Sequence, residues 1–449
     1  MVNARMLAYQ ILLHLEQKPS QPERLIRAML DRHRGLEERD RALLTELVYG
    51  VLRWRGRLDW HIDALSKISP KKIDPAVRIL LRLALYQILL LDRIPPHAAV
   101  NETVKIARAT QAPHVAGFIN AVLREAIRRE DRWQWPSRES APDRFLAVTT
   151  SHPLWFVQRC LRDFGFEETL GICEANNAVA PLVLRVNTLK TGRSLVLEWL
   201  ASQGLEAEGS SLLPCAVKAV GIRQDVTKWP IFSEGLVQVQ DEASQLVAHL
   251  VSPEPGERVL DLCAGFGGKS THLGILMGNA GEITAVDQSA WKLEQLKENA
   301  RRQGICIVSP LAADVLELPP ETLGSFDRVL LDAPCSGFGT LRRKPDIKWR
   351  RSPKDPYRFG MTQRSLLAHA AKFVKKGGVL VYATCTVFSE EDEQVARHFT
   401  EDFSEWALER ADGFLPESSR GLTDGPFLRS LPHRHGTDGF FGARWRRTG

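Results

Sequence analysis

The first third of the chain repeats apolar residues at helical spacing. Between residues 4 and 15 the apolar positions share one helical face behind Asn3, which is typical of an N-cap. The dipeptide Asp74-Pro75 has the cap and first-turn residues of another helix. The same period recurs at residues 44–51, 77–91 and 100–107. This pattern predicts an all-α domain over residues 1–135.

The periodic pattern then stops. Residues 128–144 are polar, contain proline and have no period, which indicates a linker. Beyond them, residues 181–188 and 204–221 have strand patterns, and residues 192–203 have a helical one. We therefore expect a small α+β subdomain over residues 145–234, without catalytic residues of its own.

From residue 235 to residue 449, short apolar strands alternate with helical segments. The strand patterns are at residues 259–264, 282–287, 326–334 and 377–385, and residues 290–303 are one of the intervening helices. Such alternation predicts a mostly parallel sheet with helices on both faces, that is, a Rossmann-like α/β domain. Open sheets of this kind bind ligands at the carboxyl ends of their strands.

Composition is that of an ordinary globular protein with more than one core. The chain has 449 residues, of which 44% are hydrophobic and 25% charged, and its formal charge is +6. Basic residues on the polar faces of the helical part form either a solvated face or an RNA-facing surface. They are Arg53, Arg55, Arg57, Lys67, Lys71, Lys72, Arg78 and Arg82.

The seven cysteines are an odd number and form no CxxC pair, so neither a disulfide framework nor a zinc site is indicated. The N-terminus lacks a signal-peptide pattern, and no apolar run reaches the ~18 residues of a membrane span. We expect a cytoplasmic protein without a metal or a membrane partner.

A glycine-rich turn, DLCAGFGGKS at residues 261–270, follows the first strand of the α/β domain. Its glycines let a ligand approach the backbone, and its spacing does not fit a P-loop, which disfavours ATP. Asp287 and Asp314 end the next two strands, and Asp287 is suitably placed to bind ribose hydroxyls. The pattern predicts a nucleoside-type cofactor site; the alternative is an ordinary turn with solvated carboxylates.

Two cysteines stand at two further strand ends. One tip reads Asp332-Ala-Pro-Cys335, and the other reads Ala383-Thr-Cys385. Both tips should converge on the crevice of the cofactor. A thiolate that adds to carbon 6 of cytosine makes carbon 5 nucleophilic toward an electrophilic methyl group, and Asp332 could bind the N3/N4 edge of the base. Covalent catalysis on cytosine is the hypothesis that these residues suggest.

Several ordered motifs resemble those of the RNA cytosine-5 methyltransferases. They are RVNTLK (185–190), QDEASQLV (240–247), DLCAGFGGKS, AVD, DAPCSGFGTLRRKPDIKW (332–349), YATCTVFSEEDE (382–393) and HGTDGFFGA (435–443). The N-terminal helical domain resembles the NusB fold, which makes the chain most similar to the Sun/Fmu-type 16S rRNA cytosine-5 methyltransferases of bacteria. The resemblance covers nearly the whole chain.

This resemblance implies S-adenosylmethionine as the cofactor. It assigns cofactor contacts to Cys263, Ala264, Gly265, Phe266, Gly267, Gly268, Lys269, Asp287, Asp314 and Asp332. It makes Cys385 the nucleophile and gives Cys335 a part in product release, with Asp332 between cofactor and base. The implied target is cytosine 967 of 16S rRNA, as naked RNA or in a small-subunit assembly intermediate. We expect a monomer.

The turn departs from the family at two places. Gly265-Phe266 stands where the family has Ala-Pro, and Ser270 stands where it has Thr. Because proline fixes one backbone torsion, its replacement permits a different path for the turn.

A basic run follows the Pro-Cys tip, and it predicts contacts with RNA phosphates; the alternative is a solvated basic loop. Its predicted RNA-binding residues are Arg342, Arg343, Lys344 and Lys348. Two other functions remain open: methylation of another rRNA or tRNA site, and a non-catalytic RNA-binding antitermination factor. Two thiols at one crevice argue against the second, because a binding module has no need of them.

Overall fold

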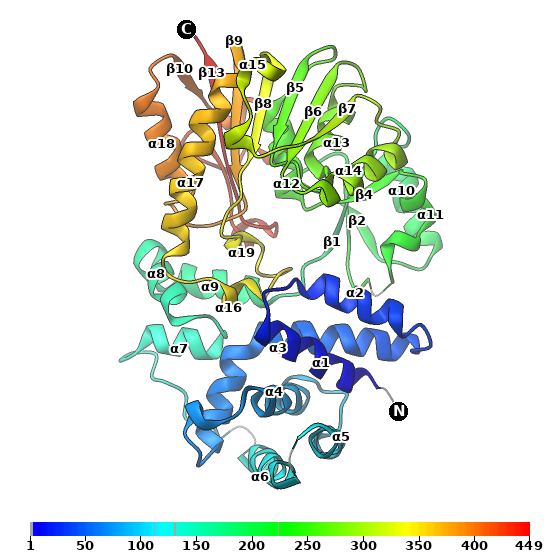
Figure 1. The fold of residues 1–449 in the computed structure, drawn as a ribbon, viewed down its shortest axis with the longest axis vertical. Helices are drawn as coiled ribbons and strands as arrows, with labels where there is room; N and C mark the ends of the chain where they lie inside the picture. The colour runs from blue at the N-terminus through cyan, green and yellow to red at the C-terminus, as the bar shows by residue number, and fades with distance from the viewer. Residues whose placement is uncertain (1–2, 112, 130–131, 223) are drawn as a thin grey trace. The chain divides into compact units, whose positions relative to one another are not determined.

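The chain folds into two compact units. The structure, a computed structural model, describes residues 3–111, 113–129, 132–222 and 224–449. The first unit comprises residues 1–177 with residues 344–351, and the second comprises residues 178–343 with residues 352–449 (Figure 1). The predicted boundary near residue 145 therefore does not coincide with the division between the units.

The first unit is all-helical, as predicted. Asn3 caps the first helix by accepting a hydrogen bond from the Met6 N–H (2.9 Å), and Asp74 caps α4 by accepting one from the Ala76 N–H (2.8 Å). The helices are α1 Ala4–Gln17, α2 Pro22–Arg32, α3 Glu38–Leu65, α4 Pro75–Leu90, α5 Pro96–Thr110, α6 Pro113–Arg129, α7 Pro142–Thr149, α8 Leu154–Phe164 and α9 Phe166–Asn177. Among the described residues, none of the helices has the length and apolar character to span a bilayer.

Helices α7 to α9 explain the shifted boundary. Leu146, Phe156 and Val157 are fully buried, and α7 packs against α3. The Ser151 hydroxyl accepts a hydrogen bond from the Gly56 N–H in α3 (2.9 Å). By its contacts, the segment after the linker therefore groups with the first unit, although the prediction assigned it to the α+β subdomain. Of the predicted linker 128–144, residues 130 and 131 lie outside the described residues.

The second unit begins with a small α+β subdomain. Its strands are β1 Leu182–Val186, β2 Ala207–Gly209, β3 Ala216–Ala219 and β4 Val237–Val239, in the antiparallel order β2-β3-β1-β4. Helices α10 Arg193–Ser202 and α11 Pro230–Ser233 accompany them. Leu184, Val186 and Leu200 form the centre of its apolar core. The predicted strand at residues 181–188 and helix at residues 192–203 are both present.

A nine-stranded mixed sheet makes up the rest. Its order is β11-β12-β13-β9-β8-β5-β6-β7, with β10 paired to β13. The strands are β5 Arg258–Leu262, β6 Glu282–Asp287, β7 Val308–Ala312, β8 Phe326–Asp332, β9 Val374–Thr384, β10 Trp406–Glu409, β11 Thr423–Asp424, β12 Phe427–Ser430 and β13 Phe440–Arg447. Strands β5 to β9 are parallel to one another. Strand β13 pairs antiparallel with β9, β10 and β12 pair antiparallel with β13, and β11 pairs antiparallel with β12. The predicted Rossmann-like sheet is present with an antiparallel extension.

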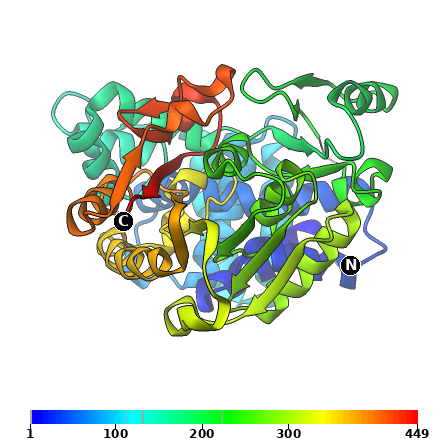
Figure 2. The same ribbon diagram turned by 90° about the horizontal axis from the view of Figure 1, so that it is seen from above.

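Helices cover both faces of this sheet (Figures 1 and 2). Side chains alternate along each strand, so Leu260 and Leu262 of β5 pack on one face while Val259 packs on the other. The first face is covered by α17 Asp355–Ala370 and α18 Glu393–Asp402. The second is covered by α12 Glu242–Val251, α13 Gly268–Leu276 and α14 Ala290–Gln303. The remaining short helices are α15 Pro320–Leu323, α16 Ile347–Arg350 and α19 Pro432–His435.

Arg185 joins the small subdomain to the large sheet. Its guanidinium is fully buried and donates hydrogen bonds to four acceptors. These are Gln240 Oε1 (2.7 Å), the Gly268 carbonyl (2.5 Å), Thr271 Oγ1 (2.9 Å) and Gln303 Oε1 (2.7 Å). Because two of the acceptors belong to α13 and the others come from the segment before α12 and from α14, one side chain of RVNTLK fixes the start of α13 relative to β1.

We expect Arg185→Met to destabilise the protein by about 3 kcal/mol, because it leaves buried acceptors without donors. Urea unfolding followed by circular dichroism measures this. Arg410→Ala, which removes only an exposed ion pair with Asp412, should leave the urea midpoint unchanged. Equal midpoints for Arg185→Met and wild type would contradict the assigned role.

Candidate active site

The strand-end residues predicted for cofactor binding and catalysis lie along one edge of the large sheet. Strand pairing aligns Leu262 of β5 with Val286 of β6 and with Leu331 of β8. The same register aligns Asp332 with Ala383 of β9. The strand order reverses direction along the chain at β5, which is the switch point where open α/β sheets bind ligands. The loops that follow these four strands therefore share one edge.

The glycine-rich turn takes backbone conformations that favour glycine. Gly265 and Gly267 have φ values of 59° and 76°, and a Cβ on Gly267 would lie 2.4 Å from Leu296 Cγ. Cys263 also has a positive φ of 64°. The turn leads directly into α13, so backbone amides are available to a ligand at its start.

The structure shows how the turn is built at Gly265-Phe266, where the sequence differs from the family motif. The Gly265 N–H donates a hydrogen bond to Asp287 Oδ2 (3.0 Å), which closes the turn onto the end of β6. Phe266 is 48% exposed, and its ring meets the ring of Trp291 edge-on with centroids 5.5 Å apart. The turn thus exposes an aromatic side chain where the family has proline.

Asp287 and Asp314 follow neighbouring strands. Asp287 is mostly buried; besides Gly265 it accepts a hydrogen bond from the Ser289 N–H (2.8 Å), and the Lys292 ammonium lies 3.3 Å away. Asp314 accepts hydrogen bonds from the Leu316 N–H (2.9 Å) and from Gln288 Nε2 (2.6 Å). The structure therefore puts Asp287 against the turn, at the end of β6, and Asp314 after the end of β7, bonded to Gln288.

Asp261 is a site residue that the sequence analysis did not single out. It is fully buried in β5, and its Oδ2 accepts a hydrogen bond from the Ser270 hydroxyl (2.6 Å). Its Oδ1 is buried without a hydrogen-bond partner. Burial raises the pKa of Asp261 to about 7. A free acceptor next to bare backbone amides suits a ligand that carries both donor and acceptor groups, as S-adenosylmethionine does.

Lys269 joins the turn to the Pro-Cys tip. Its ammonium lies 2.6 Å from Asp332 Oδ2 and 5.2 Å from the centroid of the Phe440 ring. Burial opposes the charged form of Lys269, yet the charge and hydrogen bond of Asp332, with smaller contributions from Cys385 and Asp261, raise its pKa above the ordinary value. Lys269 is therefore a cation within electrostatic reach of Cys385 and favours a negatively charged sulfur there.

The two strand-end cysteines lie in contact. Their sulfur atoms are 3.2 Å apart, and the Cys385 N–H points to Cys335 Sγ at 3.4 Å. The hydrogen bond with Cys385, in which the Cys335 thiol acts as donor, and then burial raise the pKa of Cys335 well above its ordinary value. Burial and the nearby carboxylates raise the pKa of Cys263 to about 12. Cys335 and Cys263 therefore remain thiols at neutral pH.

A buried polar network holds the two cysteine tips. Glu391 accepts hydrogen bonds from the Ser336 N–H (2.7 Å), from Thr386 Oγ1 (3.2 Å) and from Gln363 Nε2 (3.3 Å). Burial raises its pKa. Glu391 belongs to a quoted motif but could not be singled out from the sequence, because its role depends on partners from three separate segments.

The structure corrects the predicted RNA contacts of two cations after the Pro-Cys tip. Arg342 is buried and pairs with Asp241 (2.9 Å) and Asp438 (2.5 Å). Arg343 pairs with the same carboxylates at 2.8 and 3.0 Å and is partly buried. These guanidiniums bind the start of α12 to the segment before β13. Arg342 is therefore structural, and phosphate binding by Arg343 would compete with its two carboxylates.

Lys348 is also internal, in the helical unit. It is fully buried and donates hydrogen bonds to the Arg53 carbonyl (3.2 Å), the Ser151 carbonyl (3.1 Å) and Asn177 Oδ1 (2.7 Å). An ammonium without exposed surface does not meet RNA, so the prediction is wrong for Lys348 in this structure. Lys344 alone among the four predicted RNA contacts is exposed.

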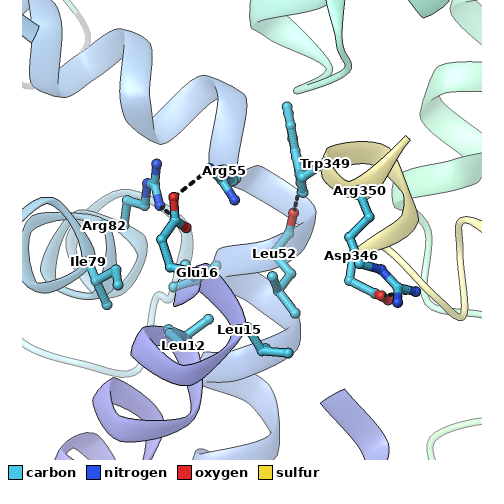
Figure 3. Close-up of a pocket in the computed structure, with 11 residues that line it drawn as sticks. Leu12, Leu15, Glu16, Leu52, Arg55, Ile79, Arg82, Asp346, Trp349 and Arg350 are labelled. Atoms are coloured by element: carbon cyan, nitrogen blue, oxygen red, sulfur yellow. Dashed lines mark hydrogen bonds and ion pairs between the residues drawn. The ribbon is translucent and has the colours of Figure 1, made fainter. Parts of the chain in front are cut away.

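Asp346, Trp349 and Arg350 help to line a cavity of about 190 Å³ in the helical unit (Figure 3). The Trp349 indole N–H donates to the Leu52 carbonyl (2.6 Å), and Glu16 lies between Arg55 (3.0 Å) and Arg82 (3.4 Å). Part of the predicted basic surface is therefore internally paired. Lys67, Lys71 and Lys72 are exposed.

Comparison with known proteins agrees with this architecture. Residues 248–446 match the family described as 16S rRNA methyltransferase RsmB/F, and residues 2–128 match the NusB family. Residues 152–223 match the ferredoxin-like domain of the RsmF/B-like methyltransferases.

Similar proteins align over almost the whole length. The probable ribosomal RNA small subunit methyltransferase B of Bacillus subtilis strain 168 is 39% identical over 100% of this chain and 99% of its own length. The ribosomal RNA small subunit methyltransferase B of Escherichia coli O6:K15:H31 is 36% identical over 98% of each chain. The crystal structure of PH0851 superposes with a TM-score of 0.83 at 30% identity, over 100% of this chain and 99% of that one. The chain belongs to the 16S rRNA methyltransferase RsmB/F family.

Proposed function

We propose that this protein transfers a methyl group from S-adenosylmethionine to carbon 5 of a cytosine in 16S rRNA, through a covalent bond between Cys385 and the base. The proposed position is cytosine 967, and the proposed substrate is the naked RNA or a small-subunit assembly intermediate in the cytoplasm. The observation that carries the proposal is the 3.2 Å contact of Cys335 and Cys385 next to the Lys269–Asp332 ion pair.

The turn and the neighbouring strand ends have the groups that this cofactor needs. Residues 263–269 with the backbone amides at the start of α13, the free oxygen of Asp261 and the carboxylates of Asp287 and Asp314 would hold its methionine, ribose and adenine parts. When bound, S-adenosylmethionine supplies an electrophilic methyl group on sulfur. Asp332, which pairs with Lys269 of the turn and precedes Cys335 by three residues, is the group that would face both cofactor and base.

Cys385 is the proposed nucleophile. Its thiolate electron pair forms a bond to carbon 6, and the π electrons of the C5–C6 bond move toward carbon 5 and the ring nitrogen N3. Lys269 favours the thiolate, and Asp332 would hold the N3/N4 edge of the base while N3, which gains electron density, takes up a proton from water. Carbon 5 is thereby activated to accept the methyl group.

Cys335 has the complementary role. After methylation, the proton on carbon 5 passes to a water molecule, its bonding electrons form the C5–C6 double bond again, and Cys385 leaves as a thiolate while N3 gives up its proton to solvent. The raised pKa of Cys335 keeps it a thiol within 3.2 Å of Cys385, where it can exchange a proton with the departing sulfur. Cys385 would therefore attack as a thiolate, while the protonated Cys335 next to it would act only when Cys385 is released.

RNA docking is proposed for exposed lysines instead of the buried cations. Lys344, and Lys67, Lys71 and Lys72 of the helical unit, are free of the internal ion pairs that occupy Arg342. The target cytosine must leave any base stack to reach a half-buried thiol, which costs a few kcal/mol and favours a loop nucleotide.

Cys385→Ala should lower kcat for methyl transfer to unmodified 16S rRNA by about 10³-fold or more, because the base is no longer activated covalently. Transfer of a radioactive methyl group measures this. Cys306→Ala, which removes an exposed thiol away from the sheet edge, is the matched control. Near-normal activity in Cys385→Ala would refute the nucleophile assignment.

Cys335→Ala should instead accumulate a covalent protein–RNA adduct, because addition proceeds while release is slowed. A retarded band in denaturing gels, present with S-adenosylmethionine and sensitive to ribonuclease, detects it. The double variant Cys335→Ala/Cys385→Ala should form no such band. An adduct that survives in the double variant would mean that neither assignment is correct.

Deletion of the gene should remove methylation from one cytosine of 16S rRNA, at position 967, and expression of the wild-type chain should restore it. Bisulfite sequencing of total RNA reads every cytosine at once. Loss of methylation at a transfer RNA or at another ribosomal position would mean that the protein carries out the same reaction on a different substrate. Unchanged methylation throughout would contradict the proposed function.

A further inference from the structure

Three metal-binding side chains meet outside the catalytic edge. Cys215 precedes β3 of the small sheet, His249 is near the end of α12, and His272 is in α13. One ligand atom from each lies within 4.8 Å of the other two. The three residues are 34 and 23 positions apart in sequence, so they do not form a short metal-binding motif. The absence of a CxxC pair therefore did not exclude a site of this kind.

The imidazoles of His249 and His272 lack hydrogen bonds that buried histidines normally form. His249 Nε2 and His272 Nδ1 are both buried without a hydrogen-bond partner. Their rings meet edge-on with centroids 5.3 Å apart, and His272 is only 1% exposed. A buried polar atom normally has a partner, so two such atoms beside a thiol point to a ligand that accepts nitrogen and sulfur lone pairs.

We propose that Cys215, His249 and His272 bind a Zn²⁺ ion. One thiolate and two imidazoles are the donors that zinc prefers, and tetrahedral ligands of zinc lie about 3.5 Å from each other, a small adjustment from the observed limit of 4.8 Å. Cys215 is half-buried, which leaves the fourth position open to water. Binding would release the thiol proton of Cys215 to solvent.

The position of the site gives the ion a structural role. Cys215 belongs to the small subdomain, whereas His249 and His272 belong to helices that cover the large sheet. His272 follows Lys269 by three residues in the same helix. A bound ion would therefore clamp the small sheet to the first turns of α13, beside the contact that Arg185 already makes with the Gly268 carbonyl.

Titration of the full-length, metal-free protein with Co²⁺ under reducing conditions tests this. We expect saturation at about one ion per chain, with a thiolate-to-cobalt charge-transfer band and the visible bands of tetrahedral Co²⁺. Added Zn²⁺ should displace the cobalt and abolish both signals. Metal analysis of the protein purified without chelators should also give about one zinc per chain.

Variants separate this site from adventitious binding. Cys215→Ser should lose the charge-transfer band, and His249→Gln and His272→Gln should each weaken Co²⁺ binding by at least about tenfold. Cys306→Ser removes an exposed thiol and should leave the titration unchanged. Circular dichroism shows whether each variant is folded. A wild type without a thiolate band, or a band that persists in folded Cys215→Ser, would overturn the proposal.

Discussion

The parallel pairing of β8 with β9 is the constraint on which the active edge depends. Because Asp332 lies opposite Ala383, β8 ends three residues before Cys335 and β9 ends directly before Cys385, so that the two tips leave the sheet side by side. Cys335 and Cys385 are 50 residues apart in sequence yet only 3.2 Å apart at sulfur. A slip of one residue in this register would turn the side chains to the opposite face and separate the sulfurs.

Holding two tips this closely requires a polar interior behind them. Glu391 bonds the backbone of one tip and the side chain of the other, and Asp392 pairs with Arg429 at 2.9 Å while fully buried. Gly339 and Gly439 approach so closely that a Cβ on Gly339 would lie 2.0 Å from the Gly439 carbonyl oxygen. Buried charges contribute little net stability, but a fully satisfied network fixes side-chain positions. The tips are thus ordered by hydrogen bonds that an apolar core could not supply.

The elements and the strand-end residues could be predicted from sequence because they depend on local pattern. The helix at residues 290–303 was predicted with its observed bounds, and the strand ends located Asp287 and both cysteines. The partners of the charged side chains could not be predicted, because the sequence does not show which distant residues the fold brings next to them. Arg342 finds Asp241 and Asp438, which are 101 and 96 residues away. Residues 344–351 likewise gave no local sign that they fold with the helical unit.

The glycine-rich turn shows why a departure from a family motif need not change the site. What the turn offers at Gly265 is a backbone N–H to Asp287, and any residue except proline could donate it. Its φ of 59° is what favours glycine, so Gly265 permits a path that the proline-containing version reaches differently. The side chain lost at position 265 is compensated at position 266, where Phe266 meets Trp291. The contacts that define the edge, from Asp261, Lys269 and Asp332, remain on rigid elements at either side of the turn.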